Sequence, residues 1–276
     1  MVEQILGSFV SWQYDAGTWM ITTCMGSQYM YLLEGEEYAM LIDTAYGLGD
    51  LRGLVEKLTD KPVITVNTHG HLDHVGGNGQ WQKVYMHQNA LIDQKTLEGG
   101  PCDISKLPYP DYEKCFIEEG HVFHLGGRDI EVIDITAHSN GSLAFLDASH
   151  GLLYTGDELE AAQVLLYELV PTGNYDLRQR LLAHHANMEK LLSRSREFDH
   201  ICAGHNGSPI AKDYAEDFFE LSTLLLEGKI ALEKELHHND IKDPDLRRAR
   251  YRKASFFVRQ SDLDKMNEIK FEGEME

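Results

Sequence analysis

Short apolar runs alternate with amphipathic segments over the first 210 residues, a pattern typical of α/β proteins. Residues 51–58 place leucine and valine at the i, i+3, i+4 and i+7 spacing of a helix with one apolar face. Residues 176–194 and a segment that begins near Asn89 predict two further helices. The remaining apolar runs are short and bounded by turn residues, and they predict β-strands at 28–34, 38–43, 62–67, 83–87, 121–126, 129–135, 142–148, 151–157 and 200–204.

Two regions depart from this alternation. Residues 95–120 are rich in turn residues and predict an irregular insertion, a kind of loop that often covers or lines a binding site. From residue 211 the pattern becomes helical, and Pro244 stands near the first turn of a further predicted helix. We therefore expect a catalytic domain over residues 1–210 and a helical C-terminal extension over residues 211–276, which packs on that domain or on a partner subunit.

The chain of 276 residues carries 45 acidic and 25 basic side chains, a formal net charge of −20. This charge repels nucleic acids at long range, so we expect no nucleic-acid partner. It does not exclude a small anion as substrate, because such an anion can be drawn to bound metal.

The four cysteines form no paired motif, no apolar run is long enough to cross a bilayer, and the N-terminus lacks the pattern of a secretory signal. We expect a cytoplasmic protein without a membrane partner.

The densest group of reactive side chains lies in residues 67–78, NTHGHLDHVGGN, directly after an apolar, β-branched run. His69 and His71 stand two residues apart at a strand end, so both can point the same way. Asp73 and His74 are adjacent and need a turn or a helix start to do so. A polar loop rich in histidine is the alternative, but H-x-H-x-D-H after a buried strand favours metal binding and can present two ligands to each of two ions.

Together with later motifs, this run resembles the signature of the metallo-β-lactamase-fold hydrolases. The other motifs of that family occur in order: LIDT with Asp43, HSNGS with His138, LLYTGD with Asp157 and ICAGH with His205. The resemblance covers about residues 20–210 and implies an αββα four-layer sandwich, here followed by the C-terminal helical extension. The family often has T-P-G-H where this chain has ITAH. His71 stands where flavin-linked di-iron members carry glutamate, which favours a hydrolase over an oxygen-reducing protein.

The resemblance also implies a dinuclear metal centre. The implied ligands of one metal are His69, His71 and His138, those of the other are Asp73, His74 and His205, and Asp157 bridges the two. Asp43 would steady a ligand by hydrogen bonding. Imidazoles with carboxylates suit two divalent ions, zinc first, with manganese or iron as alternatives. A metal-bridging hydroxide would attack the substrate, and Asp73 would act as the catalytic residue that orients it.

The expected substrate is a small molecule with an ester-like bond: a thioester, a lactone or a carboxylic ester. A small-molecule phosphodiesterase and a metal-bearing sensor or interaction protein are the alternatives.

Tyr167 and Tyr175, in the apolar stretch after Asp157, are candidates for substrate binding, although simple packing explains either one alone. His184 lies on a helical stripe and is expected in the core or at its boundary. A homodimer is a further possibility for the C-terminal helices.

Overall fold

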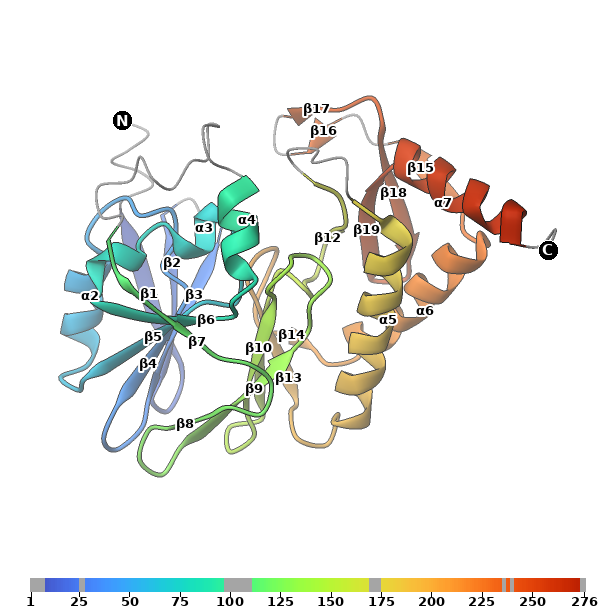
Figure 1. Cartoon of the computed structure of the whole chain (residues 1–276). Coiled ribbons are helices and arrows are strands. Elements are labelled where there is room, and N and C mark those ends of the chain that lie inside the picture. The colour runs from blue at the N-terminus through green and yellow to red at the C-terminus, as the bar shows by residue number, and fades with distance from the viewer. Residues whose placement is uncertain are drawn as a thin grey trace.

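Two mixed β-sheets lie face to face and carry helices on their outer sides (Figure 1). The computed structural model describes residues 8–24, 28–96, 111–168, 175–234, 237–238 and 241–273. The first sheet contains, in spatial order, β1 (Phe9–Asp15), β2 (Thr18–Thr23), β3 (Tyr29–Glu34), β4 (Ala39–Ile42), β5 (Val63–Val66), β6 (Lys83–Met86) and β7 (Glu113–Phe116). The second contains β14 (Ile210–Ala211), β13 (His200–Ala203), β11 (Leu152–Gly156), β10 (Leu143–Asp147), β9 (Asp129–Asp134) and β8 (Val122–His124).

Helices cover both outer faces of this pair of sheets (Figure 1). The helices are α2 (Leu51–Leu58), α3 (Leu72–Val75), the 3-10 turn η1 (Asn78–Gln80), α4 (Ala90–Thr96), α5 (Leu177–Ser193), α6 (Tyr214–Glu227) and α7 (Gln260–Gly273). Within the described part of the chain, no helix is both long and apolar enough to cross a membrane.

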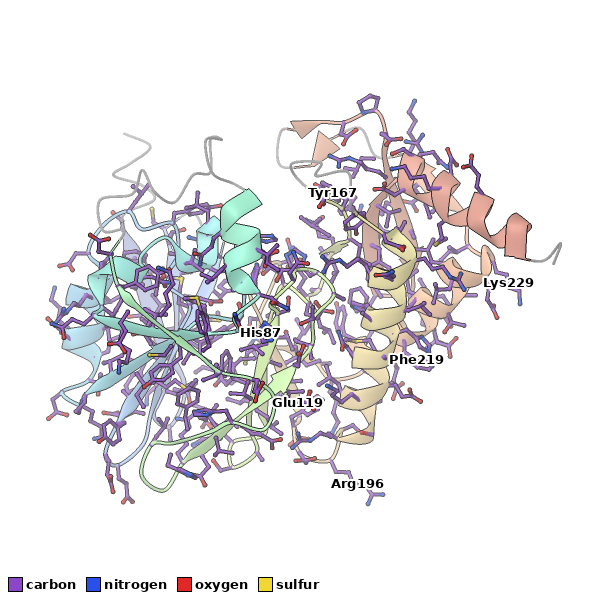
Figure 2. All side chains as sticks on the ribbon, viewed as in Figure 1. His87, Glu119, Tyr167, Arg196, Phe219 and Lys229 are labelled. Carbon is purple, nitrogen blue, oxygen red and sulfur yellow. The ribbon has the colours of Figure 1, made fainter. Side chains whose placement is uncertain are left out.

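Alternation of side chains along the strands separates an inner from an outer face of each sheet. Between the sheets, Leu33 of β3 and Phe145 of β10 belong to one buried cluster. On the outer face of the first sheet, Leu51 of α2 is buried in a second cluster. On the outer face of the second sheet, Leu146 of β10 packs in a third cluster with Leu181 of α5. The side chains therefore fill four layers, and the predicted αββα sandwich is confirmed (Figure 2).

The strands and helices predicted between residues 28 and 204 are all present. Two of the features that were not predicted extend the first sheet at its edges. An N-terminal hairpin, β1–β2, adds an edge to the first sheet, and β7 lies inside the insertion expected at residues 95–120, where it pairs with β6 in parallel. Residues 97–110 of that insertion lie outside the described residues.

The C-terminal region is only partly helical. Helices α6 and α7 are present, but the helix predicted from Pro244 is wrong: β18 (Leu246–Tyr251) and β19 (Ala254–Arg259) form an antiparallel hairpin there. With β12 (Val164–Leu165) and β15 (Leu232–Lys234) they make a four-stranded sheet, and β16 (His237–His238) pairs with β17 (Ile241–Lys242).

The burial of β19 explains why this segment is a strand. Ala254, Phe256 and Val258 alternate along it and are buried in the cluster that contains Leu146 and Leu181. The C-terminal residues therefore share a core with the second sheet and α5. The division into domains at residue 210 stays a prediction.

His184 of α5 lies in this shared core, as expected from its helical stripe, and is fully buried. Its Nε2 donates to the carbonyl oxygen of Glu158 at 3.1 Å, and its ring packs edge-on against Phe256. Burial lowers the pKa of His184 from about 6.5 to about 3. The native state therefore keeps this imidazole neutral at a pH where the unfolded chain binds a proton.

We expect the free energy of unfolding to fall as pH drops from about 6.5 toward 3, because only the unfolded state takes up this proton. The contribution of His184 approaches ~1.4 kcal/mol per pH unit. In the His184→Gln variant, urea denaturation across this range should show a shallower pH dependence. The exposed His200→Gln variant is the control; equal slopes in all three proteins would contradict the assignment.

Candidate metal centre

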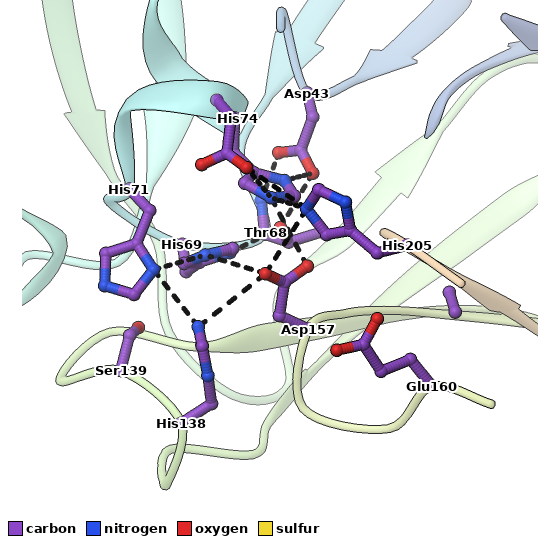
Figure 3. A network of polar contacts seen from close by, with 12 residues as sticks. Asp43, Thr68, His69, His71, His74, His138, Ser139, Asp157, Glu160 and His205 are labelled. Carbon is purple, nitrogen blue, oxygen red and sulfur yellow. Dashed lines mark hydrogen bonds and ion pairs between the residues drawn. The ribbon is translucent and has the colours of Figure 1, made fainter. Parts of the chain in front are cut away.

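The seven predicted ligands all follow the carboxyl ends of strands, where the two sheets meet (Figure 3). The run His69–His74 follows β5 of the first sheet. The ligands after strands of the second sheet are His138 after β9, Asp157 after β11 and His205 after β13. Strand ends that run in the same direction converge at one edge, so residues up to 136 positions apart in sequence come together here.

A short helix lets the adjacent residues Asp73 and His74 face the same site. His71 has extended backbone angles, and α3 begins directly after it at Leu72. Close packing beneath this turn requires glycine, because a Cβ on Gly77 would lie 2.4 Å from the carbonyl oxygen of Thr44. The histidine and aspartate side chains are thus carried on a turn pressed against the end of β4.

The first group of ligand atoms comes from three histidines and one aspartate. Nδ1 of His71 lies 3.1 Å from Nε2 of His69 and 3.1 Å from Nε2 of His138. Oδ2 of Asp157 lies 3.8 Å from Nε2 of His69 and 3.7 Å from Nε2 of His138. All four atoms lie within 4.8 Å of one another, a spacing compatible with one metal ion.

A second group lies beside the first and consists of Asp73, His74 and His205. Nε2 of His205 lies 3.2 Å from Nε2 of His74 and 3.1 Å from Oδ2 of Asp73. Asp157 also faces this group: its Oδ1 lies 3.3 Å from Nε2 of His74, and its Oδ2 lies 3.5 Å from Nε2 of His205. Asp157 is therefore within 4 Å of histidines from both groups.

Asp43 lies behind the second group and contacts two parts of the histidine run. Its Oδ2 is 2.8 Å from Nδ1 of His74 and accepts from the Thr68 hydroxyl at 2.7 Å, while its Oδ1 accepts from the Thr68 amide at 2.8 Å. Contact with the carboxylate puts the proton of His74 on Nδ1 and turns the lone pair of Nε2 toward the site. This is the arrangement expected of a group that orients a metal ligand.

The two groups differ in the pKa values of their histidines. Burial lowers the pKa of His69 well below its ordinary value and that of His138 to about 4, so both imidazoles are neutral. Burial also opposes charge on His74 and His205, but the carboxylates, Asp157 first, outweigh it; they raise the pKa of His205 to about 10 and that of His74 well above its ordinary value. The site as a whole favours positive charge.

The carboxylates complete this pattern. Burial alone would raise the pKa of Asp73 and Asp157, but the histidines beside them reverse the effect and leave both carboxylates ionised at neutral pH. Oδ1 of Asp157 is buried and faces Nε2 of His74 at 3.3 Å. Imidazole nitrogens and carboxylate oxygens that crowd together in this way fit divalent metal ions, which would take the place of the protons that the carboxylates favour on His74 and His205.

Tyr167 and Tyr175 lie next to arginines. The ring of Tyr167 (Figure 2), two residues after β12, lies 5.0 Å from the guanidinium of Arg259, and that of Tyr175 lies 5.9 Å from the guanidinium of Arg180. Burial raises the pKa of Tyr167 to about 12, so its hydroxyl stays protonated. Contact of either tyrosine with substrate stays a prediction.

Sequence reasoning missed two residues that contact the backbone around His138: Glu158 and Arg180. The only available signal was that Glu158 directly follows Asp157 in the TGDE run. Arg180 had no signal, because one arginine on an amphipathic helix is ordinarily a solvent-exposed residue.

Comparison with known proteins agrees with this geometry. The family model of the metallo-beta-lactamase superfamily matches residues 25–205. The human acyl-coenzyme A thioesterase MBLAC2 is 27% identical over 158 residues, which cover 46% of this chain and 57% of that protein. A hydroxyacylglutathione hydrolase of Nostoc punctiforme is 30% identical over 165 residues, which cover 57% of this chain and 60% of the relative. The chain thus spans somewhat more than half the length of these curated relatives.

Solved structures share the fold at low sequence identity. A metallo-beta-lactamase from Pontibacter korlensis has a TM-score of 0.59 at 18% identity and covers 78% of this chain and 99% of its own. A metallo-beta-lactamase from Cronobacter sakazakii has a TM-score of 0.60 at 18% identity, with coverages of 83% and 97%. The ordered motifs, the four-layer architecture and the match over residues 25–205 lead to one conclusion: this chain belongs to the metallo-beta-lactamase superfamily.

Proposed function

We propose that this protein is a metal-dependent hydrolase of small thioesters. The observation that carries the proposal is the position of Asp157 between two groups of histidines, within 4 Å of nitrogens from both. The names of the relatives support the substrate class, since an acyl-coenzyme A thioesterase and a hydroxyacylglutathione hydrolase both act on acyl groups carried by a thiol. Lactones and carboxylic esters are related but secondary candidates.

The proposed ligand roles follow the two groups. His69, His71 and His138 would hold one divalent ion, Asp73, His74 and His205 the other, and Asp157 both. Zinc is the proposed metal, with manganese or iron as alternatives, because imidazole and carboxylate donors suit all three. When bound, the two ions would supply a hydroxide at neutral pH and polarise the substrate carbonyl.

The chain's own residues would orient this chemistry. Asp43 holds His74 with its Nε2 lone pair toward the site, and the carbonyl of Leu165 accepts from Nδ1 of His138, which frees Nε2 of that ring in the same way. Asp73 is the proposed catalytic residue. Its side chain retains 23% exposure, so its carboxylate can take a proton from the attacking water and pass that proton to the departing thiolate.

A substrate panel tests the proposal directly. Zinc-loaded protein would be assayed with an acyl-coenzyme A, an acylglutathione, a lactone and a phosphodiester. The highest kcat/KM is expected on one of the two thioesters, and a chelator should abolish it. A preference for the phosphodiester would replace the proposal with a phosphodiesterase. Failure of every substrate, together with metal-independent binding of a partner through residues 211–276, would favour an interaction protein.

Replacing Asp43 with asparagine tests the proposed orienting role. The amide can present its NH₂ group to Nδ1 of His74 and would then favour the tautomer whose Nε2 carries the proton. We expect zinc affinity at the second group to fall about 10- to 100-fold, measured by competition with a chelator. The exposed Asp60→Asn variant is the matched control, and equal affinity in Asp43→Asn and wild type would show that the contact does not set the tautomer.

A further inference from the structure

The loop that carries His138, residues 136–142, connects β9 to β10 and is held mainly by residues outside itself. Its internal side-chain contacts form a turn: the Ser139 and Ser142 hydroxyls lie 3.0 Å apart, the Ser139 amide donates to the Ser142 hydroxyl at 3.3 Å, and the Gly141 amide donates to the Ser139 hydroxyl at 3.3 Å. None of these three contacts involves the backbone of His138. The position of this proposed ligand therefore depends on neighbouring elements.

Arg180 of α5 donates hydrogen bonds to this loop on both sides of His138. Its Nη1 donates to the carbonyl oxygens of Ala137 and Ser139, each at 3.1 Å, and its Nη2 donates to Oδ1 of Asn140 at 2.6 Å. A guanidinium group holds several acceptors in one plane, which a flexible ammonium group does not do. The carbonyls before and after His138 are thus fixed by one rigid side chain.

Glu158 holds the same peptide unit from the other end. Its Oε2 accepts from the backbone amide of His138 at 2.7 Å, and its Oε1 accepts from Nδ2 of Asn187 on α5 at 3.1 Å. The Ala137 carbonyl and the His138 amide belong to one planar peptide group. With Arg180 on the oxygen and Glu158 on the nitrogen, the plane of this group, and with it the direction of the His138 side chain, is set.

We propose that Arg180 and Glu158 are positioning residues that clamp the peptide group before His138, so that helix α5 sets the place of one ligand of the first metal group. The inference rests on the proposed metal centre. Neither residue was among the candidate site residues named from the family motifs.

The second metal group is held by different residues. The carbonyl of His74 accepts from the Thr44 amide and hydroxyl and from Nδ2 of Asn67, and Asp43 holds the imidazole of His74. None of these contacts involves α5. Loss of the clamp should therefore weaken the first group and spare the second, an outcome that general destabilisation of the fold would not produce.

The test measures zinc occupancy in Arg180→Ala. Wild type is expected to bind two zinc ions tightly, and Arg180→Ala to retain one while the other is held about 10- to 100-fold more weakly, as measured by chelator competition and elemental analysis. Millimolar guanidinium should restore the weak ion, because it can occupy the space left by the side chain. Arg180→Lys, which keeps the charge but not the planar fork, should lie between the two.

Matched variants separate positioning from folding. Arg178→Ala, on the same helix, is the control and should bind as wild type does. Glu158→Gln keeps an acceptor for the His138 amide and should retain more zinc than Glu158→Leu. Circular dichroism of the metal-free proteins checks that each variant is folded. Restoration of zinc binding by guanidinium tests the proposal even if the Arg180→Ala variant is less stable than wild type.

The outcomes distinguish this inference from the proposed function. If wild type hydrolyses thioesters but Arg180→Ala and Glu158→Leu bind both ions with wild-type affinity, the clamp is wrong and the function stands. If one ion is lost selectively and guanidinium restores it while no thioester is cleaved, the clamp stands and the function is wrong. Equal weakening of both ions, without rescue, would show a general structural effect and overturn the proposal.

Discussion

Replacing Asp157 with asparagine is expected to remove about half of the bound metal and to lower hydrolysis by more than about 100-fold. Changes to groups that only orient metal ligands typically cost 10- to 100-fold, and Asp157 is the proposed ligand shared by both ions. Its two oxygens face histidines of both groups at 3.3 to 3.8 Å. The amide has one oxygen, no negative charge, and an NH₂ group that would face imidazole nitrogens.

Elemental analysis and steady-state kinetics on the same preparation measure the two effects together. The exposed Asp60→Asn variant should leave both unchanged. A variant of Asp157 that keeps its full metal content would show that this carboxylate does not bridge. Full metal content with lost activity would instead restrict its role to orienting the substrate or the attacking water.

Arg128 lies in the turn between β8 and β9. Replacing it with methionine is expected to cause the largest loss of stability. Arg128 is 3% exposed and donates from Nε to Oδ2 of Asp147 at 2.8 Å, from Nη2 to the Thr18 hydroxyl at 2.7 Å and from Nη1 to the carbonyl oxygen of Gly17 at 2.8 Å. The side chain thereby joins the second sheet to the β1–β2 turn of the first. Its removal leaves the fully buried carboxylate of Asp147 without its cation, which costs about 3–5 kcal/mol.

Urea denaturation of the metal-free protein measures this change without interference from ligand binding. The exposed pair Arg52–Glu56 provides the control, since Arg52→Met should change the free energy of unfolding by less than about 1 kcal/mol. The double variant Arg128→Met, Asp147→Leu should recover part of the loss, because no buried charge is left unpaired. A loss below about 1 kcal/mol in Arg128→Met would contradict the structural role.

The prediction of strands and helices from sequence succeeded where a segment's own pattern matches its environment. Residues 51–58 carry a helical stripe that faces one layer, and α2 forms there. Residues 246–259 contain leucine, arginine and alanine, which favour helix, yet they form β18 and β19. Their pairing with β12 and the burial of Phe256 against α5 and α6 override local propensity, and neither contact can be read from the segment alone.

The proposed metal ligands could be named from the sequence because metal chemistry restricts both residue type and spacing. His69, His71, Asp73 and His74 follow one strand, and the later motifs follow others. Strand ends of one direction meet at one edge of a sheet, so an ordered set of such motifs predicts a single site. The structure brings all seven residues together in two groups.

By itself, then, the sequence determined the class of fold, the positions along the chain of the strands that end at the site, and the identity of the clustered histidines and aspartates. Only the tertiary structure decided what holds them: the contact of Asp43 with Nδ1 of His74, the carbonyl of Leu165 on His138 and the clamp of Arg180 and Glu158. The physical reason is that a ligand must have one of a few side chains at a given place, whereas the hydrogen bond that orients it can come from any donor or acceptor that packing brings within reach.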